Sequence, residues 1–312
     1  MTARYNLIIY HVPEKQSVSD FHTIRNKMAV RAPEIEVHIV STSVATTTAF
    51  WRKAAERPTL IFSAIAIRLG RGDVPIRGAR LISNPLSKFE EAQLMSRAGA
   101  PVPETILIEP ETRIDEAQWG PFTVIKPNSG KQGRGVRLIR TKDVRWTDTS
   151  ALPKDDPRHG QELLAQRYVD TGPFVASFRV MMVLGRPVYS VVSTAIERRP
   201  DPMTSNAVEM DVAANGVERS VTLNNDAEII DMAKAIHAKL PQLPVMGIDI
   251  IREQNTGRLF ALEYNSGGRF WHISSDYGRA QQRKYGLDYN SQFDALNTIT
   301  DALIEATRKR AV

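Results

Sequence analysis

Towards the end of the chain, two carboxylates and an amide lie in a pattern that is typical of a β-hairpin. Residues 246–267 read MGIDIIREQNTGRLFALEYNSG, in which two apolar runs flank the turn-forming residues 255–257. If those three residues form the loop, Asp249 lies opposite Glu263, and Asn265 shares the face of Glu263 because strand side chains alternate. Like charges opposite each other destabilise a sheet, whereas carboxylate and carbonyl oxygens are the ligands that Mg²⁺ prefers. The hairpin is therefore either a magnesium site shared with substrate phosphates or an ordinary solvated strand face.

A glycine-rich loop with two basic residues lies between two β-patterned runs earlier in the chain. Residues 129–135 read SGKQGRG, and Lys126 lies on the strand just before them. Three glycines allow a backbone to turn tightly and to approach a ligand, and its N–H groups can hold phosphate oxygens. Taken alone, the loop is either a phosphate-binding loop or a plain flexible hairpin loop, and the usual interpretation of a single strand lysine such as Lys126 is a solvated strand face.

The composition excludes several classes of protein. The 312 residues are 42% apolar and 24% charged, as in soluble globular proteins, and the absence of cysteine excludes disulfides, thiolate catalysis and Cys-zinc sites. There is no HExxH, GxSxG or GxxxxGK[ST] motif, no apolar run near the roughly 20 residues of a membrane span, and no signal-peptide pattern. The net charge of +6 is spread along the chain, which suits anionic small ligands such as nucleotides and makes nucleic acid an unlikely partner. We therefore expect a cytoplasmic protein that does not bind membranes.

Helix and strand patterns alternate up to residue 65, and turn-forming residues predominate in the segment that follows. The order strand, helix, strand, helix, strand up to residue 65 predicts a small parallel sheet flanked by helices. A turn-rich connector follows, and then a helix begins at an N-cap, Ser87, and ends at Gly99. Farther on we predict long strands over 161–170 and 176–199, with a tight turn at Gly185, and helices over 227–240 and 288–310.

The order of these pieces over residues 85–268 resembles the ATP-grasp superfamily of carboxylate–amine ligases. A strand lysine precedes the glycine-rich loop, LLAQRYV follows about 40 residues on, and a strand arginine, Arg179, precedes GIDII and LEYNSG. The AIERR sequence at 195–199 and the SN pair at 205–206 are most similar to the branch that contains the ribosomal-protein glutamate ligase.

The resemblance implies an ATP-grasp fold of the α/β (α+β) class, in which an N-terminal parallel α/β domain precedes two α+β subdomains that enclose the nucleotide. It divides the chain into residues 1–84, a central and lid subdomain with the glycine-rich loop at 85–170, and a C-terminal subdomain with the metal site at 171–312.

The resemblance also implies a role for each candidate site residue. Two lysines would bind the phosphates of ATP: Lys88 and Lys126. A mobile flap would cover the phosphates, formed by Ser129, Gly130, Lys131, Gln132, Gly133, Arg134 and Gly135. A hinge would receive adenine, formed by Gln166, Arg167, Tyr168 and Val169. The ligands for one or two Mg²⁺ ions, with Mn²⁺ as an alternative, would be Asp249, Glu263 and Asn265. The residues near the reacting phosphoryl or acyl group would be Arg179, Asn206 and Arg269.

Two departures from the glutamate ligases concern substrate recognition. Where those ligases place an acidic residue for ribose, two positions before the strand arginine, this chain has Ser177, and Asp170 is a candidate substitute. After the LEYN sequence, Arg269, Trp271 and His272 either shape a distinct acceptor or acyl pocket or, in the case of Trp271 and His272, pack against the last helix.

The expected activity is ATP-dependent formation of an amide or peptide bond through an acyl phosphate, with release of ADP and phosphate. The expected substrates are small-molecule or peptide carboxylates and amines, and a homo-oligomer is expected. Two alternatives stay open: a kinase that phosphorylates a small molecule, and a nucleotide-binding protein that regulates without catalysis.

Overall fold

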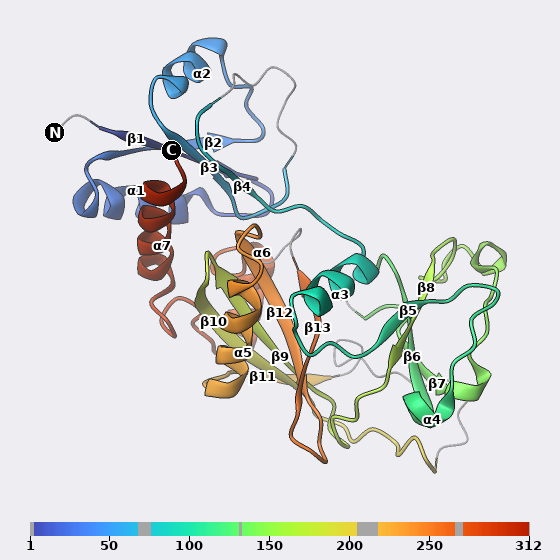
Figure 1. Ribbon diagram of the computed structural model, residues 1–312. Helices are drawn as coiled ribbons and strands as arrows, with labels where there is room; N and C mark the ends of the chain where they lie inside the picture. The colour runs from blue at the N-terminus through green and yellow to red at the C-terminus, as the bar shows by residue number, and fades with distance from the viewer. Residues whose placement is uncertain (1–2, 68–75, 131–132, 205–217, 266–270, 312) are drawn as a thin grey trace.

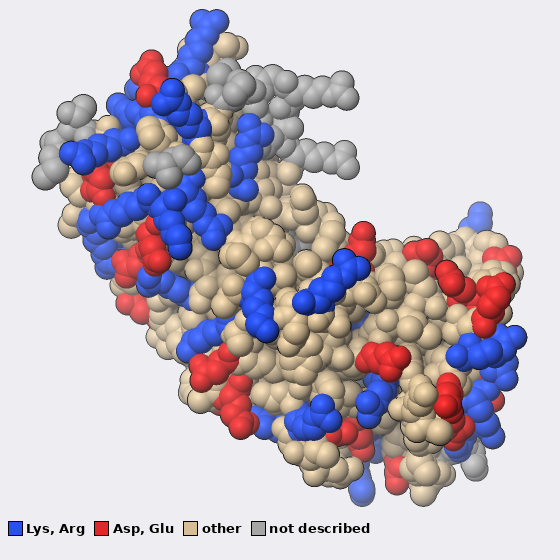
Figure 2. Space-filling view, viewed as in Figure 1, with Lys and Arg blue, Asp and Glu red and all other residues tan. Residues whose placement is uncertain are grey.

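The computed structural model describes residues 3–67, 76–130, 133–204, 218–265 and 271–311. Within these residues the strands form three sheets with helices packed against them (Figure 1). None of the described helices is both long enough and apolar enough to cross a bilayer. Figure 2 shows basic and acidic side chains interspersed over one face of the molecule, in agreement with the spread of charge along the chain.

The first sheet is parallel and has the strand order β2-β1-β3-β4. Leu7 and Ile9 point to a face covered by α1 and α7, whereas Ile8 points to the face covered by α2, because side chains alternate along a strand. The elements of this region are β1 (Tyr5–His11), α1 (Val18–Arg31), β2 (Ile35–Ser41), α2 (Thr48–Ala55), β3 (Thr59–Ser63), β4 (Arg80–Ile82) and α7 (Ala295–Arg310). The predicted parallel strand–helix alternation is confirmed.

Helix α7 returns from the far end of the sequence to pack beside α1 (Figure 1). Leu303 of α7 shares a core with Phe21 of α1 and Phe62 of β3. The backbone N–H of Ala79 donates to the carbonyl of Arg310 at 2.8 Å, so the end of α7 is hydrogen-bonded beside the first sheet.

The second sheet is antiparallel and has the strand order β11-β10-β9-β12-β13. One face, with Val180 and Ile248, packs against α5 and α3, whereas the opposite face, with Met181 and Val245, joins the core of the first sheet. The elements are α3 (Lys88–Arg97), β9 (Ala176–Val183), β10 (Arg186–Ala195), β11 (Arg219–Leu223), α5 (Ala227–Ala238), β12 (Val245–Arg252), β13 (Leu259–Asn265) and α6 (Asp276–Tyr285).

The third sheet is antiparallel and has the strand order β5-β8-β6-β7. Its core contains Ile125 of β6 and Ala165 of β8, against which Trp119 packs. The elements are β5 (Thr105–Leu107), α4 (Glu116–Trp119), β6 (Phe122–Pro127), β7 (Arg137–Arg140), two 3₁₀ turns (Thr141–Asp143 and Thr149–Ala151) and β8 (Leu163–Arg167).

The structure refines several predicted elements. The predicted tight turn at Gly185 within 176–199 is confirmed: the segment is the β9–β10 hairpin, in which Leu184 and Gly185 both have positive φ, and β10 ends at Ala195 instead of residue 199. The predicted final helix starts at Ala295 instead of residue 288. The three-part division of the chain remains a proposal, and α7 packs against the first sheet although that division assigns it to the last part.

Candidate active site

Three charged side chains lie side by side on neighbouring strands of the second sheet. Asp249 of β12 pairs with Glu263 of β13 on one side and with Arg179 of β9 on the other, so all three project from the same face. The predicted pairing of Asp249 with Glu263 is confirmed, but the loop length and the strand register that produce it differ from the prediction. The loop is one residue longer than predicted, because the N–H of Glu253 donates to the carbonyl of Arg258 at 2.9 Å, and a β-bulge next to Asp249 restores the register.

A cation accompanies each carboxylate of this row. Arg179 donates from Nε and from Nη2 to the two carboxylate oxygens of Asp249, both at 2.6 Å, and Lys88 Nζ donates to Glu263. The amide of Asn265 donates to Asp249 at 3.3 Å and so lies within the same cluster. The expected repulsion between the two opposed carboxylates is therefore compensated by neighbouring positive charge.

Lys88 is positioned by the start of α3, which is tied to the end of β6. Ser87 is the N-cap of the helix, and the next two N–H groups, of Lys88 and Phe89, donate to the backbone and side-chain oxygens of Asn128, each at 3.0 Å. The amide of Asn128 in turn donates to Glu162 at 2.8 Å. Asn128 thus connects the start of α3 with the end of β6 and the residue before β8 of the third sheet. The sequence analysis missed it, since its only signal is a polar residue after the strand that carries the lysine.

Lys126 approaches the same cluster from β6 of the third sheet. It is buried, with 6% of its surface exposed, and its Nζ donates to Gln166 Oε1 of β8 at 3.1 Å. Burial lowers the pKa of Lys126 to about 8, while Glu263 acts in the opposite direction. Lys126 is therefore a desolvated amine facing a carboxylate, and the alternative of a solvated strand lysine is wrong.

The electrostatics of the cluster hold Glu263 ionised. Burial by itself would raise the pKa of Glu263, but Lys88 and Lys126 outweigh it and hold that pKa at about 2. Glu91 lies one helical turn after Lys88 on α3 and is 8% exposed; burial, followed by the charge of Glu263, raises its pKa to about 9. The cluster thus keeps one carboxylate charged and a second, not predicted from the sequence, neutral at physiological pH.

The described parts of the glycine-rich loop adjoin the cluster through β6. The hydroxyl of Ser129 donates to Gln161, and Gly133 and Gly135 have φ values of +69° and +74°. A Cβ on Gly135 would lie 3.0–3.2 Å from Pro127 and two other side chains, so the loop returns closely onto the end of β6. Among the predicted site residues, Lys131, Gln132, Asn206 and Arg269 lie outside the described residues, so the structure leaves their positions open.

The predicted adenine hinge follows directly from β8. Gln166 is buried and donates to Thr105 at 2.8 Å, while Arg167 is exposed and continues the strand. Tyr168 donates its hydroxyl to Asp170 at 3.0 Å, and Asp170 also accepts from the backbone of Gly172 at 3.0 Å. Arg199 donates to the same carboxylate at 2.8 Å. Asp170 is thus engaged in fixing the turn after the hinge, where Val169 also lies, rather than presented as a free carboxylate.

The segment after β13 packs against the first sheet. Trp271 is 1% exposed, its ring lies against Phe21 of α1 at a centroid distance of 5.3 Å, and its Nε1 donates to Asp20 at 2.7 Å. His272 is 7% exposed, and its pKa is lowered to about 3 by burial and, to a lesser extent, by Arg179. Trp271 therefore packs against α1, and His272 is buried against the start of α6, where its ring contacts Tyr277.

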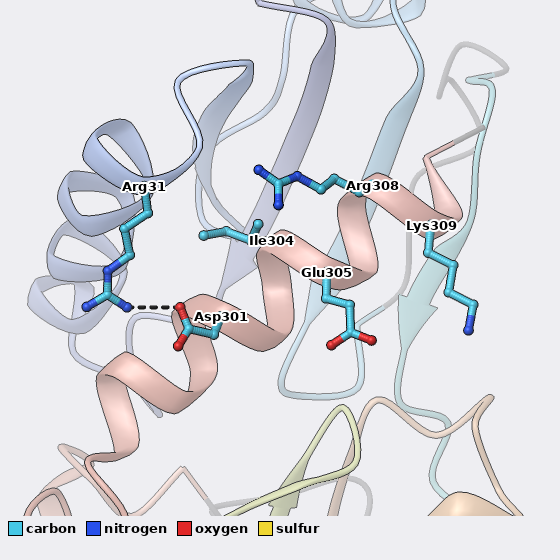
Figure 3. Close-up of a pocket in the computed structure, with 6 residues that line it drawn as sticks. All are labelled: Arg31, Asp301, Ile304, Glu305, Arg308 and Lys309. Carbon is cyan, nitrogen blue, oxygen red and sulfur yellow. Dashed lines mark hydrogen bonds and ion pairs between the residues drawn. The ribbon is translucent and has the colours of Figure 1, made fainter.

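One surface hollow lies apart from the charged row. A surface hollow of about 510 Å³ lies between α1 and α7 (Figure 3), and none of its lining residues belongs to the charged row: Arg31, Asp301, Ile304, Glu305, Arg308 and Lys309. In the described part of the chain, no three His, Cys, Asp or Glu residues come together as a metal-binding group. Asp249 and Glu263 would therefore need Asn265 and ligand oxygens to complete a metal site, as is usual for Mg²⁺ bound with phosphates.

The three-sheet architecture is that of the ATP-grasp ligases. The chain matches the ATP-grasp ligase PsnB, in a structure complexed with a phosphomimetic variant of a minimal precursor, Mg and ADP, at a TM-score of 0.54 and 15% identity, over 98% of this chain and 100% of that one. It matches the D-cycloserine synthetase DcsG at a TM-score of 0.51 and 14% identity, over 96% and 99% of the two chains. At these identities the likeness concerns the fold.

Sequence comparison assigns the chain to a family within the ATP-grasp ligases. Residues 86–284 match the RimK-like ATP-grasp domain, and the chain belongs to this family. A curated relative, the tetrahydromethanopterin:alpha-L-glutamate ligase of Methanosarcina acetivorans, is 30% identical over 87 residues, which are 28% of this chain. The match spans only 27% of that relative's length. The predicted resemblance to the RimK-like branch of the ATP-grasp superfamily is confirmed.

Proposed function

We propose that this protein is an ATP-dependent ligase that joins a carboxylate to an amine through an acyl phosphate. The observation that carries the proposal is the row formed by Arg179, Asp249 and Glu263, onto which Lys88 and Lys126 converge from two other elements. A site of this kind can balance the four negative charges of ATP with lysine, arginine and metal. Membership of an ATP-grasp family supports the same reading.

The proposed roles follow from the donor set. Asp249, Glu263 and Asn265 supply hard oxygen atoms for one or two Mg²⁺ ions, which would polarise the phosphates, with Mn²⁺ as an alternative ion. Lys88 and Lys126 bind phosphate oxygens, the loop at 129–135 covers them, and the residues of the hinge, Gln166 to Val169, hold adenine. Arg179, together with Asn206 and Arg269, acts at the reacting group.

The proposed reaction has two steps. A carboxylate oxygen attacks the γ-phosphorus of ATP, and the bond to ADP breaks, which turns a poor electrophile into an acyl phosphate. The amine nitrogen then attacks the acyl carbon, the bond to phosphate breaks, and one amine proton is released as the amide forms. The protein mainly positions the reactants, which can be worth roughly 7–11 kcal/mol.

The relatives suggest two classes of substrate. One is named as a glutamate ligase, and PsnB was captured with a precursor peptide, so amino acids and peptides are both candidates for the carboxylate and the amine. A cytoplasmic location and a homo-oligomeric state remain predictions from the sequence.

The proposal is tested by measuring ADP release over amino acids and short peptides offered in pairs, with Mg²⁺ and ATP. We expect at least one pair to give ADP and a new amide, and Glu263→Gln to abolish the reaction. ADP release with a stable phosphorylated product, instead of an acyl phosphate that hydroxylamine can trap, would favour a kinase. No release with any pair, together with intact ATP binding, would favour a non-catalytic nucleotide-binding protein.

A further inference from the structure

The turn between β8 and β9 connects the third sheet to the second. Strand β8 ends at Arg167 and β9 begins at Ala176, and the predicted adenine hinge at 166–169 runs directly into the turn. Lys126 lies on β6 of the third sheet, whereas Arg179 lies on β9. A change in this turn can therefore alter how the hinge and Lys126 lie relative to the charged row.

A single carboxylate oxygen, Oδ1 of Asp170, organises the turn. It accepts from the hydroxyl of Tyr168 and the backbone N–H of Gly172, each at 3.0 Å, and from Nη2 of Arg199 at 2.8 Å. The same Nη2 also donates to the carbonyl oxygen of Gly172 at 3.2 Å. Arg199 follows β10, which ends at Ala195, so its guanidinium ties the turn to a strand end of the second sheet.

The ring of Tyr168 contacts both sheets. It packs edge to face against Phe122 of β6, with the ring centroids 6.4 Å apart. The guanidinium of Arg199 lies 5.5 Å from the centroid of the same ring, within the range of a cation–π contact. Because Phe122 and Lys126 lie on the same strand, Tyr168 and Arg199 together link the strand of Lys126 to the second sheet.

Backbone hydrogen bonds hold the turn independently of the Arg199 side chain. The carbonyl oxygen of Asp170 accepts from the N–H of Gln254, in the loop between β12 and β13, at 2.8 Å. The N–H of Arg199 donates to the carbonyl oxygen of Pro173 at 2.7 Å. Removing the guanidinium should therefore loosen the turn without unfolding the chain.

The ion pair between Arg199 and Asp170 is poorly suited to adding stability. The side chain of Arg199 is 8% exposed, whereas that of Asp170 is 45% exposed, so the guanidinium is desolvated while solvent screens its partner. Within the described residues, Nε of Arg199 is buried and has no hydrogen-bond acceptor, which costs free energy. Fixing one arrangement is the best-attested role of such buried ionic groups.

We propose that Arg199 is a positioning residue for ATP: through Asp170 and Tyr168 it holds the adenine hinge in the conformation that binds the nucleotide. This inference rests on the proposed function, which places adenine at residues 166–169. Without Arg199 the hinge adopts other conformations as well, and the apparent Kd for ATP rises by the inverse of the fraction that stays competent. The described side-chain contacts of Arg199 lie in the turn and not in the charged row, so the chemical step is spared.

The first experiment compares two arginine variants by calorimetric titration with ATP and Mg²⁺. Arg57→Met is the matched control, because it removes a guanidinium that is 29% exposed and pairs with Glu36 at 2.5 Å, beside the first sheet. We expect Arg199→Met to raise the Kd for ATP at least about tenfold, and Arg57→Met to change it less than about threefold. A Kd in Arg199→Met that stays within about threefold of the wild type overturns the proposal, as does an equal rise in Arg57→Met.

Two milder variants keep the test decisive if Arg199→Met does not fold. Arg199→Lys keeps a charge for Asp170 but not the planar contacts of the guanidinium, so it should recover part of the affinity that Arg199→Met loses. Tyr168→Phe removes one hydrogen bond and keeps the ring, and it should raise the Kd by about threefold. A wild-type Kd in both variants overturns the proposal.

Kinetics with a substrate pair that gives ADP separate positioning from catalysis. At saturating ATP we expect kcat in Arg199→Lys to stay within about threefold of the wild type while the KM for ATP rises. A lowered kcat with an unchanged KM would place Arg199 at the reacting group and overturn the positioning role.

Hydrogen exchange without nucleotide tests the turn itself. We expect the amides of residues 168–172 to exchange faster in Arg199→Met, or in Arg199→Lys, than in the wild type, while those of β1 are unchanged. Equal exchange in the turn overturns the proposal. If the wild type binds no ATP, the proposed function fails and the ATP-positioning role with it, while the exchange result still decides whether Arg199 holds the turn.

Discussion

Glu263→Gln should destabilise the protein in the absence of nucleotide, although it relieves a repulsion with Asp249. Lys88 and Lys126 hold the pKa of Glu263 at about 2, against an ordinary value of 4.5. A difference of that size between folded and unfolded states corresponds to about 3 kcal/mol at neutral pH. The paired side chains of Lys88 and Glu263 are 17% and 24% exposed, so solvent screens part of the interaction. We therefore expect the free energy of unfolding to fall by about 2 kcal/mol.

The effect of this substitution should depend on pH. Because the folded-state pKa of Glu263 is lowered, its contribution is fully present above about pH 5 and is lost as the pH falls towards 2. Urea unfolding of the wild type and the variant should therefore differ most at pH 7, and the difference should narrow as the pH is lowered from 5 to 3.

A matched control separates the charge cluster from a general effect of losing a carboxylate. Glu109→Gln removes an exposed carboxylate that has no ion pair among the described residues, and it should leave stability unchanged. If Glu263→Gln is as stable as the wild type at pH 7, or more stable, repulsion from Asp249 outweighs the lysines and the reasoning is refuted.

Three further predictions concern the same cluster. Mn²⁺ binding, followed by EPR, should be weak without ATP, because Lys88 pairs with Glu263 and Arg179 pairs with Asp249. Lys88→Met should strengthen Mn²⁺ binding by about tenfold and weaken ATP binding. An unchanged Mn²⁺ affinity would show that Lys88 does not compete with the ion. Arg179→Ala should lower kcat by about 10²-fold with the nucleotide Kd changed only a few-fold, and loss of ATP binding with kcat retained would assign Arg179 to the nucleotide site. Glu91→Gln should be more stable than the wild type at pH 8 by at least about 1 kcal/mol, because the raised pKa of Glu91 makes stability fall as the pH rises from about 4.5 to about 9. Near pH 4 that difference in the free energy of unfolding should vanish, and a difference that persists there would contradict the assignment.

The carboxylate pair could be predicted from the sequence because hairpin pairing is local. Turn residues and strand alternation place Asp249 opposite Glu263 with few assumptions. The bulge that restores this register could not be foreseen, since nothing in the residues themselves distinguishes a longer loop with a bulge from a shorter loop without one.

Contacts between distant segments were beyond the sequence analysis. The burial of Lys126 depends on Gln166 of another strand, and the role of Asn128 depends on where α3 begins. The anchoring of Trp271 by Asp20 joins positions 251 residues apart. Such partners depend on how the sheets pack, and local propensity carries no information about packing.

The return of α7 to the first sheet affects the order in which the chain can fold. Strands β1, β3 and β4 emerge early from the ribosome, but the face that carries Leu7 and Phe62 is covered by α1 together with Leu303 of α7. That face stays partly open to water until both other sheets have been synthesised, and exposed apolar surface of this kind favours aggregation and chaperone binding. The region that is made first is therefore among the last to be completed.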